Sequence, residues 1–164
     1  MKVSASRIVL WLLVVTLGIE IGAGIYEACV LLPLWAGAPP GSLVAYNLQA
    51  LRPQPGPNFW IVLTPLVGLL GLANLVAAWR SSLPQRRLWL WGASGVVCMV
   101  VATFAYFVPT LLGFEALRQV GDETVAASVH LWVMLNWVRG AVYVAAWFCL
   151  LHAYGYGAES ATRA

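Results

Sequence analysis

Residues 130–151 read HLWVMLNWVRGAVYVAAWFCLL, an apolar stretch of membrane-spanning length with an amide and a positive charge near its middle. Asn136 and Arg139 would lie deep in hydrocarbon, where an unpaired charge costs roughly 3 kcal/mol on insertion scales. Such residues are retained when they face a protein interior and find partners there. The apolar run 8–35 contains two glutamates, so opposite charges are available at membrane depth. The sequence therefore predicts a membrane protein with a buried polar site.

Composition points to the same class. Of the 164 residues, 62% are hydrophobic and only 9% are charged, against roughly 25% charged residues in soluble domains, and the mean hydropathy is +0.83. Four apolar segments are long enough to cross about 30 Å of hydrocarbon as helices, at about 8–35, 59–79, 88–113 and 129–153. We expect one all-α domain over 1–164, an integral membrane antiparallel four-helix bundle with a left-handed twist.

Charges in the connecting segments indicate the orientation. Five basic residues precede the first segment or lie in the turn between the second and third: Lys2, Arg7, Arg80, Arg86 and Arg87. The connections 36–58 and 114–128 carry one arginine each. The positive-inside rule then predicts both termini and the 80–87 turn on the cytoplasmic side of a cell's inner membrane. Because the basic residues flank spans rather than cover a face, we expect a lipid bilayer and no nucleic acid as partner.

Two features concern the ends of the bundle. The middle of the outer connection 36–58, SLVAYNLQAL, predicts a short helix with Ser42 as its cap, which would either close the bundle or admit a ligand. Tryptophans near the expected helix ends are typical of interfacial anchors: Trp35, Trp60, Trp79, Trp89 and Trp91.

Helical periodicity predicts which polar residues share an interior. At about 100° per residue, Glu20 and Glu27 fall on one face of the first helix. The other helices align stripes that include Thr64 and Asn74, Thr103 and Tyr106, and Trp132, Asn136, Arg139 and Tyr143. Glu20 and Arg139 should both lie near the bilayer centre, with Glu27 about 10 Å further out. We therefore predict a charge pair of Glu20 with Arg139, direct or through Asn74 or water, and leave open whether it is structural or sets the charge of a site.

The opposite face of the first helix carries Gly18 and Gly22, spaced as in GxxxG. Small residues at this spacing allow another helix to approach closely. That helix could belong to the same chain or to a second copy, so the pattern leaves a homo-oligomer open.

Motifs for common chemistry are absent from the sequence. It contains no HExxH, phosphate-binding glycine loop or CxxC, and its three cysteines lie in separate apolar segments. His130 and Glu27 are the one pair of nearby candidate metal ligands, an incomplete first shell for most metals.

Four motifs follow one another along the chain: GAGIYEACVLLPLWAGAPP at 22–40, FWIVLTPL at 59–66, FAYFVP at 104–109 and WVMLNWVRG at 132–140. In order and spacing they resemble the anthrone oxygenase-like family of small four-helix membrane proteins, long described as a domain of unknown function. The likeness covers nearly the whole chain and rests on these positions: Gly24, Tyr26, Glu27, Pro33, Trp35, Pro39, Pro40, Phe59, Pro65, Phe104, Tyr106, Phe107, Pro109, Trp132, Asn136, Trp137, Arg139, Ala146 and Trp147. His130 is not among them.

The resemblance implies an activity. Named members of the family are linked to oxidation of anthrones to anthraquinones in polyketide biosynthesis. They use molecular oxygen as co-substrate and no classical cofactor. For this chain it implies an oxidoreductase, a monooxygenase acting on an apolar aromatic small molecule.

That chemistry assigns roles to the interior residues. An anthrone has an acidic methylene group, and a carboxylate shielded from water is a competent base for it. Glu27 is the expected base, and Asn136 and Arg139 are expected to stabilise the developing oxyanion. The expected substrate-binding residues are Tyr26, Thr64, Tyr106 and Trp132.

Two other interpretations remain open from the sequence. The first is a non-enzymatic membrane subunit or small-ligand-binding protein, whose polar interior serves helix assembly. The second is a metal or haem site in the bundle, with His130 and Glu27 as its ligands.

Overall fold

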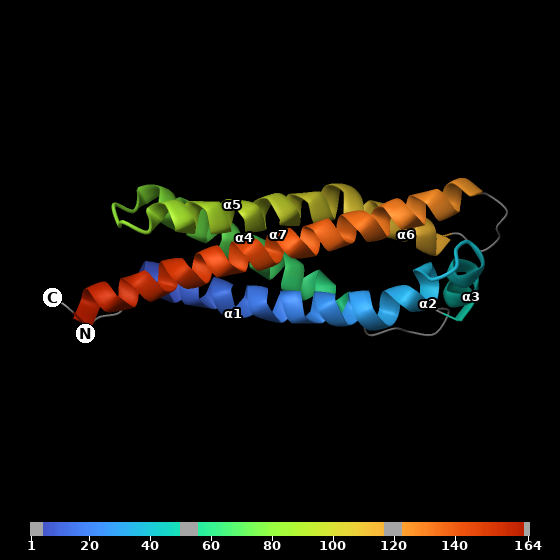
Figure 1. The fold of residues 1–164 in the computed structure, drawn as a ribbon, viewed down its shortest axis with the longest axis horizontal. Coiled ribbons are helices and arrows are strands. Elements are labelled where there is room, and N and C mark those ends of the chain that lie inside the picture. Colours follow the sequence, from blue (N-terminus) through green and yellow to red (C-terminus); the bar gives the residue numbers. More distant parts are fainter. Residues whose placement is uncertain (1–4, 50–55, 117–122, 163–164) are drawn as a thin grey trace.

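The computed structural model describes residues 5–49, 56–116 and 123–162, and within these ranges its regular secondary structure is entirely helical. Four long helical rods lie side by side (Figure 1). The first consists of α1 (Ala5–Tyr26), η1 (Glu27–Leu31) and α2 (Leu32–Ala36), and the second is α4 (Gly56–Arg80). The third joins α5 (Arg86–Ala102), η2 (Thr103–Phe107) and α6 (Val108–Ala116), and the fourth is α7 (Glu123–Thr162). A short helix, α3 (Gly41–Gln49), lies across one end.

The rods alternate in direction and pack in chain order. Helix α1 contacts α4, α4 contacts α5, α5 contacts α7, and α7 returns to α1, while diagonal pairs make few or no contacts. The start of α1, the α4–α5 turn and the end of α7 lie at one end of the bundle (Figure 1). The expected antiparallel four-helix architecture is confirmed.

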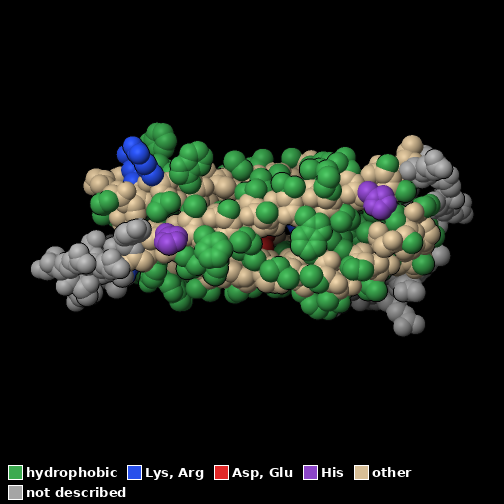
Figure 2. Space-filling model, viewed as in Figure 1, with side chains coloured by type: hydrophobic (Ala, Val, Ile, Leu, Met, Phe, Trp, Pro, Cys, Tyr) green, Lys and Arg blue, Asp and Glu red, His purple; other side chains and the backbone are tan. Residues whose placement is uncertain are grey.

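The outer surface of the bundle is apolar. Spans of membrane-crossing length and hydropathy run over Ala5–Ala36, Asn58–Arg80, Arg86–Glu115 and Thr124–Gly155, each extending beyond the range expected from the sequence at both ends. Ile61, Val62 and Leu69 on α4 are 67–69% exposed. Hydrophobic side chains cover most of the visible face between the ends (Figure 2). Large exposed apolar side chains around a helical bundle are what a lipid environment requires, so the chain is an integral membrane protein.

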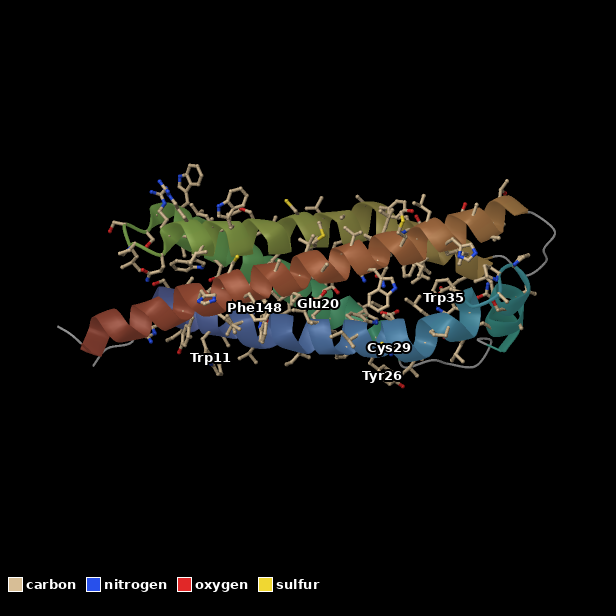
Figure 3. The ribbon with its side chains drawn as sticks, viewed as in Figure 1. Trp11, Glu20, Tyr26, Cys29, Trp35 and Phe148 are labelled. Atoms are coloured by element: carbon tan, nitrogen blue, oxygen red, sulfur yellow. The ribbon has the colours of Figure 1, made fainter. Side chains whose placement is uncertain are left out.

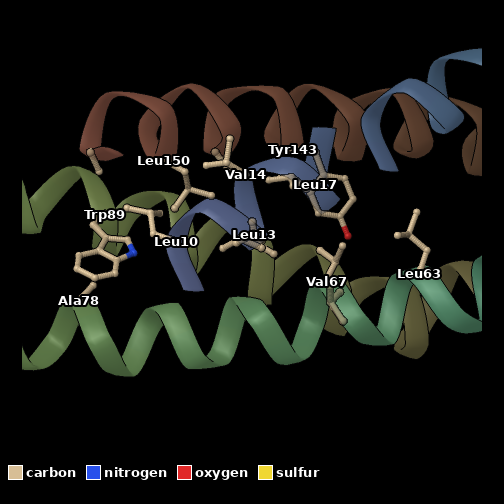
Figure 4. Packing of buried hydrophobic residues seen from close by; sticks show 14 residues of the cluster. Leu10, Leu13, Val14, Leu17, Leu63, Val67, Ala78, Trp89, Tyr143 and Leu150 are labelled. Carbon is tan, nitrogen blue, oxygen red and sulfur yellow. The ribbon is translucent and has the colours of Figure 1, made fainter. Parts of the chain in front are cut away.

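Two apolar clusters fill the interior at different depths. The inner cluster, near the α4–α5 turn, joins all four rods (Figure 4) through residues that include Leu13, Leu17, Val67, Val96 and Leu150. The outer cluster, near α3, is aromatic and consists of Leu32, Trp35, Leu43, Phe107, Phe114, Val129 and Trp132. Helix α4 contributes no buried residue to this outer cluster.

Glycine at position 92 allows α5 and α7 to approach closely. A Cβ atom there would lie 2.7 Å from Cγ of Leu150 and 2.9 Å from the carbonyl oxygen of Ala146. We expect Gly92→Ala to destabilise the protein by about 1–3 kcal/mol through overpacking, measured by unfolding in detergent. Gly22→Ala is the control, because a Cβ at Gly22 meets no atom within 4 Å. Equal stability of the two variants would contradict the close packing.

Asn74 and Trp89 connect three rods toward the end that contains the α4–α5 turn. The Trp89 indole donates to Oδ1 of Asn74 (2.9 Å), whose amide donates to the carbonyls of Val9 (3.0 Å) and Leu70 (2.8 Å). Trp89 is therefore buried and not interfacial, and Trp35 is likewise buried in the outer cluster. For these two tryptophans the prediction of interfacial anchors was wrong.

Helix α3 closes the end of the bundle opposite the α4–α5 turn (Figure 1). Leu43 packs in the outer cluster, and Asn47 donates to the carbonyl of Phe114 (2.7 Å). The short helix expected in 36–58 is thus confirmed, but Ser42 does not cap its first turn. Its hydroxyl accepts from the N–H of Ala38 (3.1 Å) and donates to the carbonyl of Trp35 (2.7 Å), so it caps the end of α2 instead.

The two glycines on the face of α1 have different surroundings. Gly18 faces α7, where a Cβ would lie 3.4 Å from Nε1 of Trp147, and that nitrogen donates to the carbonyl of Val14 (2.9 Å). The close approach at Gly18 is therefore made within the chain, which is one of the two alternatives that the GxxxG spacing left open. Gly22 is exposed.

Candidate functional site

A layer of polar side chains separates the inner and outer clusters. All four rods contribute to this polar layer, which consists of Glu20, Glu27, Thr64, Thr103, Asn136, Arg139 and Tyr143. Figure 3 shows Glu20 near the middle of the bundle's length, between α1 and α7. The inward direction expected for Glu20, Thr64, Asn136 and Arg139 thus agrees with their positions in the interior.

Glu20 is the most deeply buried acid among the described residues. It is only 6% exposed, and its Oε1 accepts a hydrogen bond from the Thr64 hydroxyl (3.3 Å). Its Oε2 is buried and has no hydrogen-bond partner of good geometry among the described residues. One carboxylate oxygen is therefore held by α4, and the other is available to a ligand or a water molecule.

Arg139 is the cation of the layer. Its Nη1 donates to the Thr103 hydroxyl (3.2 Å), and its Cζ lies 4.5 Å from the ring centroid of Phe107. The guanidinium is within electrostatic range of both Glu27 and Glu20. One positive charge thus faces two carboxyl groups, and its single hydrogen bond to the described residues leaves further N–H donors for a ligand.

Tyr143 occupies the space between Glu20 and Thr103. Its hydroxyl interacts with both, although it makes no hydrogen bond of good geometry in the described part of the chain. Because Thr103 accepts from Arg139, Tyr143 and Thr103 connect the central acid to the cation. Glu20 and Arg139 form no direct ion pair in the structure. Asn74, expected as an intermediary, lies instead in the inner network with Trp89.

Two segments of π-helix begin at residues of the polar layer. In η1 the N–H of Leu32 donates to the carbonyl of Glu27, and in η2 the N–H of Val108 donates to that of Thr103. A proline follows each segment, at 33 and 109, and proline removes one backbone donor and crowds the preceding turn. Local π geometry satisfies the displaced carbonyls in membrane helices. Such bulges are frequent at functional sites, because they redirect side chains.

Unpaired polar atoms are concentrated in this layer. Four buried side-chain atoms lack a hydrogen-bond partner in the described ranges, and three belong to the layer: Oε2 of Glu20, Oδ1 of Asn136 and the hydroxyl of Tyr143. Asn136 is 8% exposed, so its carbonyl oxygen is shielded from bulk solvent. Buried polar groups are normally satisfied, and exceptions call for a bound molecule or a chemical role.

Three expected substrate-binding residues lie away from the layer. Tyr26 is 58% exposed on the lipid-facing surface and points away from the bundle (Figure 3), which corrects its expected place in the site. Trp132 is buried in the outer cluster, where its indole donates to the carbonyl of Phe107 (3.1 Å). Tyr106 is half-buried at the edge of that cluster, with its ring against Phe107.

The remaining candidate ligands are not gathered together. His130 is exposed, and the described residues contain no group of three or more His, Cys, Asp or Glu side chains that would hold a metal ion. By contrast, sequence analysis placed Thr103 and Tyr143 on inward stripes without assigning them to the site. For Tyr143 the sequence contained a signal, because Tyr143 follows Arg139 by one helical turn and therefore lies on the same face of the helix.

No protein-family model, curated protein sequence or solved structure matches this chain.

Proposed function

We propose that the protein is a membrane-embedded oxygenase that oxidises a polycyclic, anthrone-like substrate with molecular oxygen. The observation that supports it most is the group of unpaired buried atoms of Glu20, Asn136 and Tyr143 beside the Arg139 guanidinium. An interior of this kind, enclosed by apolar clusters, suits a flat apolar molecule with a few polar substituents.

The reaction balances without a further oxidant. Glu27, half-buried at the start of η1, removes a proton from the methylene carbon and leaves an electron-rich anthranolate. The anthranolate passes one electron to oxygen, and the resulting radical pair forms a carbon–oxygen bond. The peroxide takes up a proton, and loss of water breaks its O–O bond and leaves a carbonyl group. One anthrone and one oxygen molecule give one anthraquinone and one water.

Arg139 and Asn136 stabilise the charge that develops on the substrate oxygen. Donors fixed before the reaction stabilise a developing oxyanion strongly in a site that excludes water. The Arg139 guanidinium is fixed by Thr103 and by the face of Phe107. Thr64 orients Glu20, and half-buried Tyr106, at the edge of the outer cluster, offers an aromatic surface to a flat substrate.

The test is oxygen-dependent quinone formation from a panel of anthrones, in membranes that contain the protein. Conversion of at least one anthrone, with one oxygen consumed per quinone, is the expected result. Membranes that convert none of them would favour a non-enzymatic subunit, in which hydrogen bonds such as Glu20–Thr64 and Arg139–Thr103 serve helix assembly.

The orientation supplies a separate prediction. With the end that contains the α4–α5 turn placed in the cytoplasm of a cell's inner membrane, exposed Pro84 faces inward. A Pro84→Cys variant, with the three native cysteines replaced by serine, should resist a membrane-impermeant thiol reagent in intact cells and react after lysis. Labelling of position 84 in intact cells would reverse the orientation.

A further inference from the structure

The row of buried residues on α1 is interrupted at the polar layer. Leu10, Leu13, Leu17 and Glu20 recur every three or four residues and are all at most 6% exposed. Gly24 is the next position on this face, and a Cβ built there meets no atom within 4 Å. The interior-facing surface of α1 therefore has open space one turn from Glu20.

The same region is open to the side of the bundle. Figure 2 shows a small hollow between α1 and α7, in which acidic and basic side-chain atoms are visible. It lies at the part of the bundle where Figure 3 labels Glu20. Apolar side chains surround the hollow (Figure 2), so it faces the hydrocarbon of the bilayer and not either aqueous phase.

The unpaired atoms define the chemistry that fits this space. Oε2 of Glu20 and Oδ1 of Asn136 are acceptors, and both side chains are more than nine-tenths buried. A ligand hydroxyl suits this group of atoms, because it can donate to either acceptor and can also accept from the unpaired Tyr143 hydroxyl beside Glu20. A ligand that enters through hydrocarbon must be apolar in the rest of its structure.

We propose that the polar layer is loaded sideways from the bilayer, through the hollow between α1 and α7. The ligand is a lipid-soluble molecule that places a hydroxyl group on Glu20 and its apolar body in the space beside Gly24. The inference deepens the proposed function, since it concerns the same site, but it requires binding and not turnover.

A substitution at Gly24 can fill the space beside it without replacing any polar residue of the site. The probe is 2,6-dihydroxyanthraquinone, which is already oxidised, added to protein in phospholipid nanodiscs at a mildly acidic pH. Gly24→Leu should weaken its binding at least about tenfold by steric exclusion. Gly22→Leu is the matched control on the same helix, because Gly22 also has open space but is exposed. Leucine has a higher helix propensity than glycine, so both variants should melt no lower than the wild type.

The hydroxyl contact has its own test. The dimethyl ether of the probe keeps the ring system and loses both donors, so it should bind at least about tenfold more weakly to the wild type. Glu20→Leu should remove this preference, and Met134→Leu, on the exposed face of α7, should retain it. Equal binding of probe and ether to the wild type would overturn the contact with Glu20.

The outcomes separate this inference from the proposed reaction. If Gly24→Leu abolishes probe binding and the wild-type protein oxidises no anthrone, the lateral entry is supported and the oxygenase proposal is refuted. Turnover that survives in Gly24→Leu, or a wild type that binds neither compound, would overturn the lateral entry.

Discussion

Glu27→Gln should lower the rate of quinone formation by about 10²-fold or more while leaving the melting temperature in detergent nearly unchanged. Glutamine keeps the shape of the side chain and its ability to hydrogen bond, but it cannot accept a proton from the substrate. Glu27 begins the π-helical segment η1 and lies within electrostatic range of Arg139. The interaction with Arg139 associates the Glu27 carboxylate with the polar layer and distinguishes it from a surface acid.

Three further variants test whether the loss of turnover is specific to the Glu27 carboxylate. Glu115→Gln, at an exposed position near the end of α6, should retain full turnover, because it changes a charge outside the layer. Asn136→Ala should reduce turnover by less than Glu27→Gln, as the loss of one donor to the oxyanion. Glu20→Gln identifies the base: a larger loss there than in Glu27→Gln would transfer that role to Glu20. A fully active Glu27→Gln protein would refute the proposed base.

The direction of the polar side chains was the predictable part of the site. Glu20 and Arg139 are polar residues within runs of apolar ones, and a charge in hydrocarbon must turn inward. Constant helical periodicity was sufficient for Glu20, Thr64 and Asn136, because α1, α4 and α7 are regular at these positions. The four spans followed from length and hydropathy alone.

The details that depend on packing were not predictable in the same way. A π turn closes on the fifth residue back, so a helical wheel of fixed angle loses phase after Glu27 and after Thr103. Prolines at 33 and 109 indicate a disturbed turn, yet Pro65 lies within the regular helix α4, so proline by itself does not predict a π segment. Burial of Trp132 against Trp35, with ring centroids 5.5 Å apart, depends on α2 and α3, which the periodicity of α7 does not report.

Arg139→Met should destabilise the protein by about 3–5 kcal/mol, measured by unfolding in detergent, because it leaves buried carboxyl groups without their counter-charge. The variant also loses the hydrogen bond to Thr103 and the contact with the Phe107 ring. Methionine fills a similar volume, so a cavity contributes little to the loss. Activity measured in this variant would confound folding with chemistry, which makes stability the informative measurement.

A double-mutant cycle separates the charge from these other contacts. Adding Glu20→Gln to Arg139→Met removes one uncompensated carboxyl group while its amide oxygen can still accept from Thr64. The free energies of unfolding should then depart from additivity by about 1–3 kcal/mol, whereas Glu115→Gln added to Arg139→Met should be additive. The guanidinium also interacts with Glu27, so the double variant should regain only part of the loss. Additive effects of Glu20→Gln and Arg139→Met on the free energy of unfolding would mean that Glu20 is not coupled to Arg139, and Glu27 would then be the acid that interacts with the guanidinium.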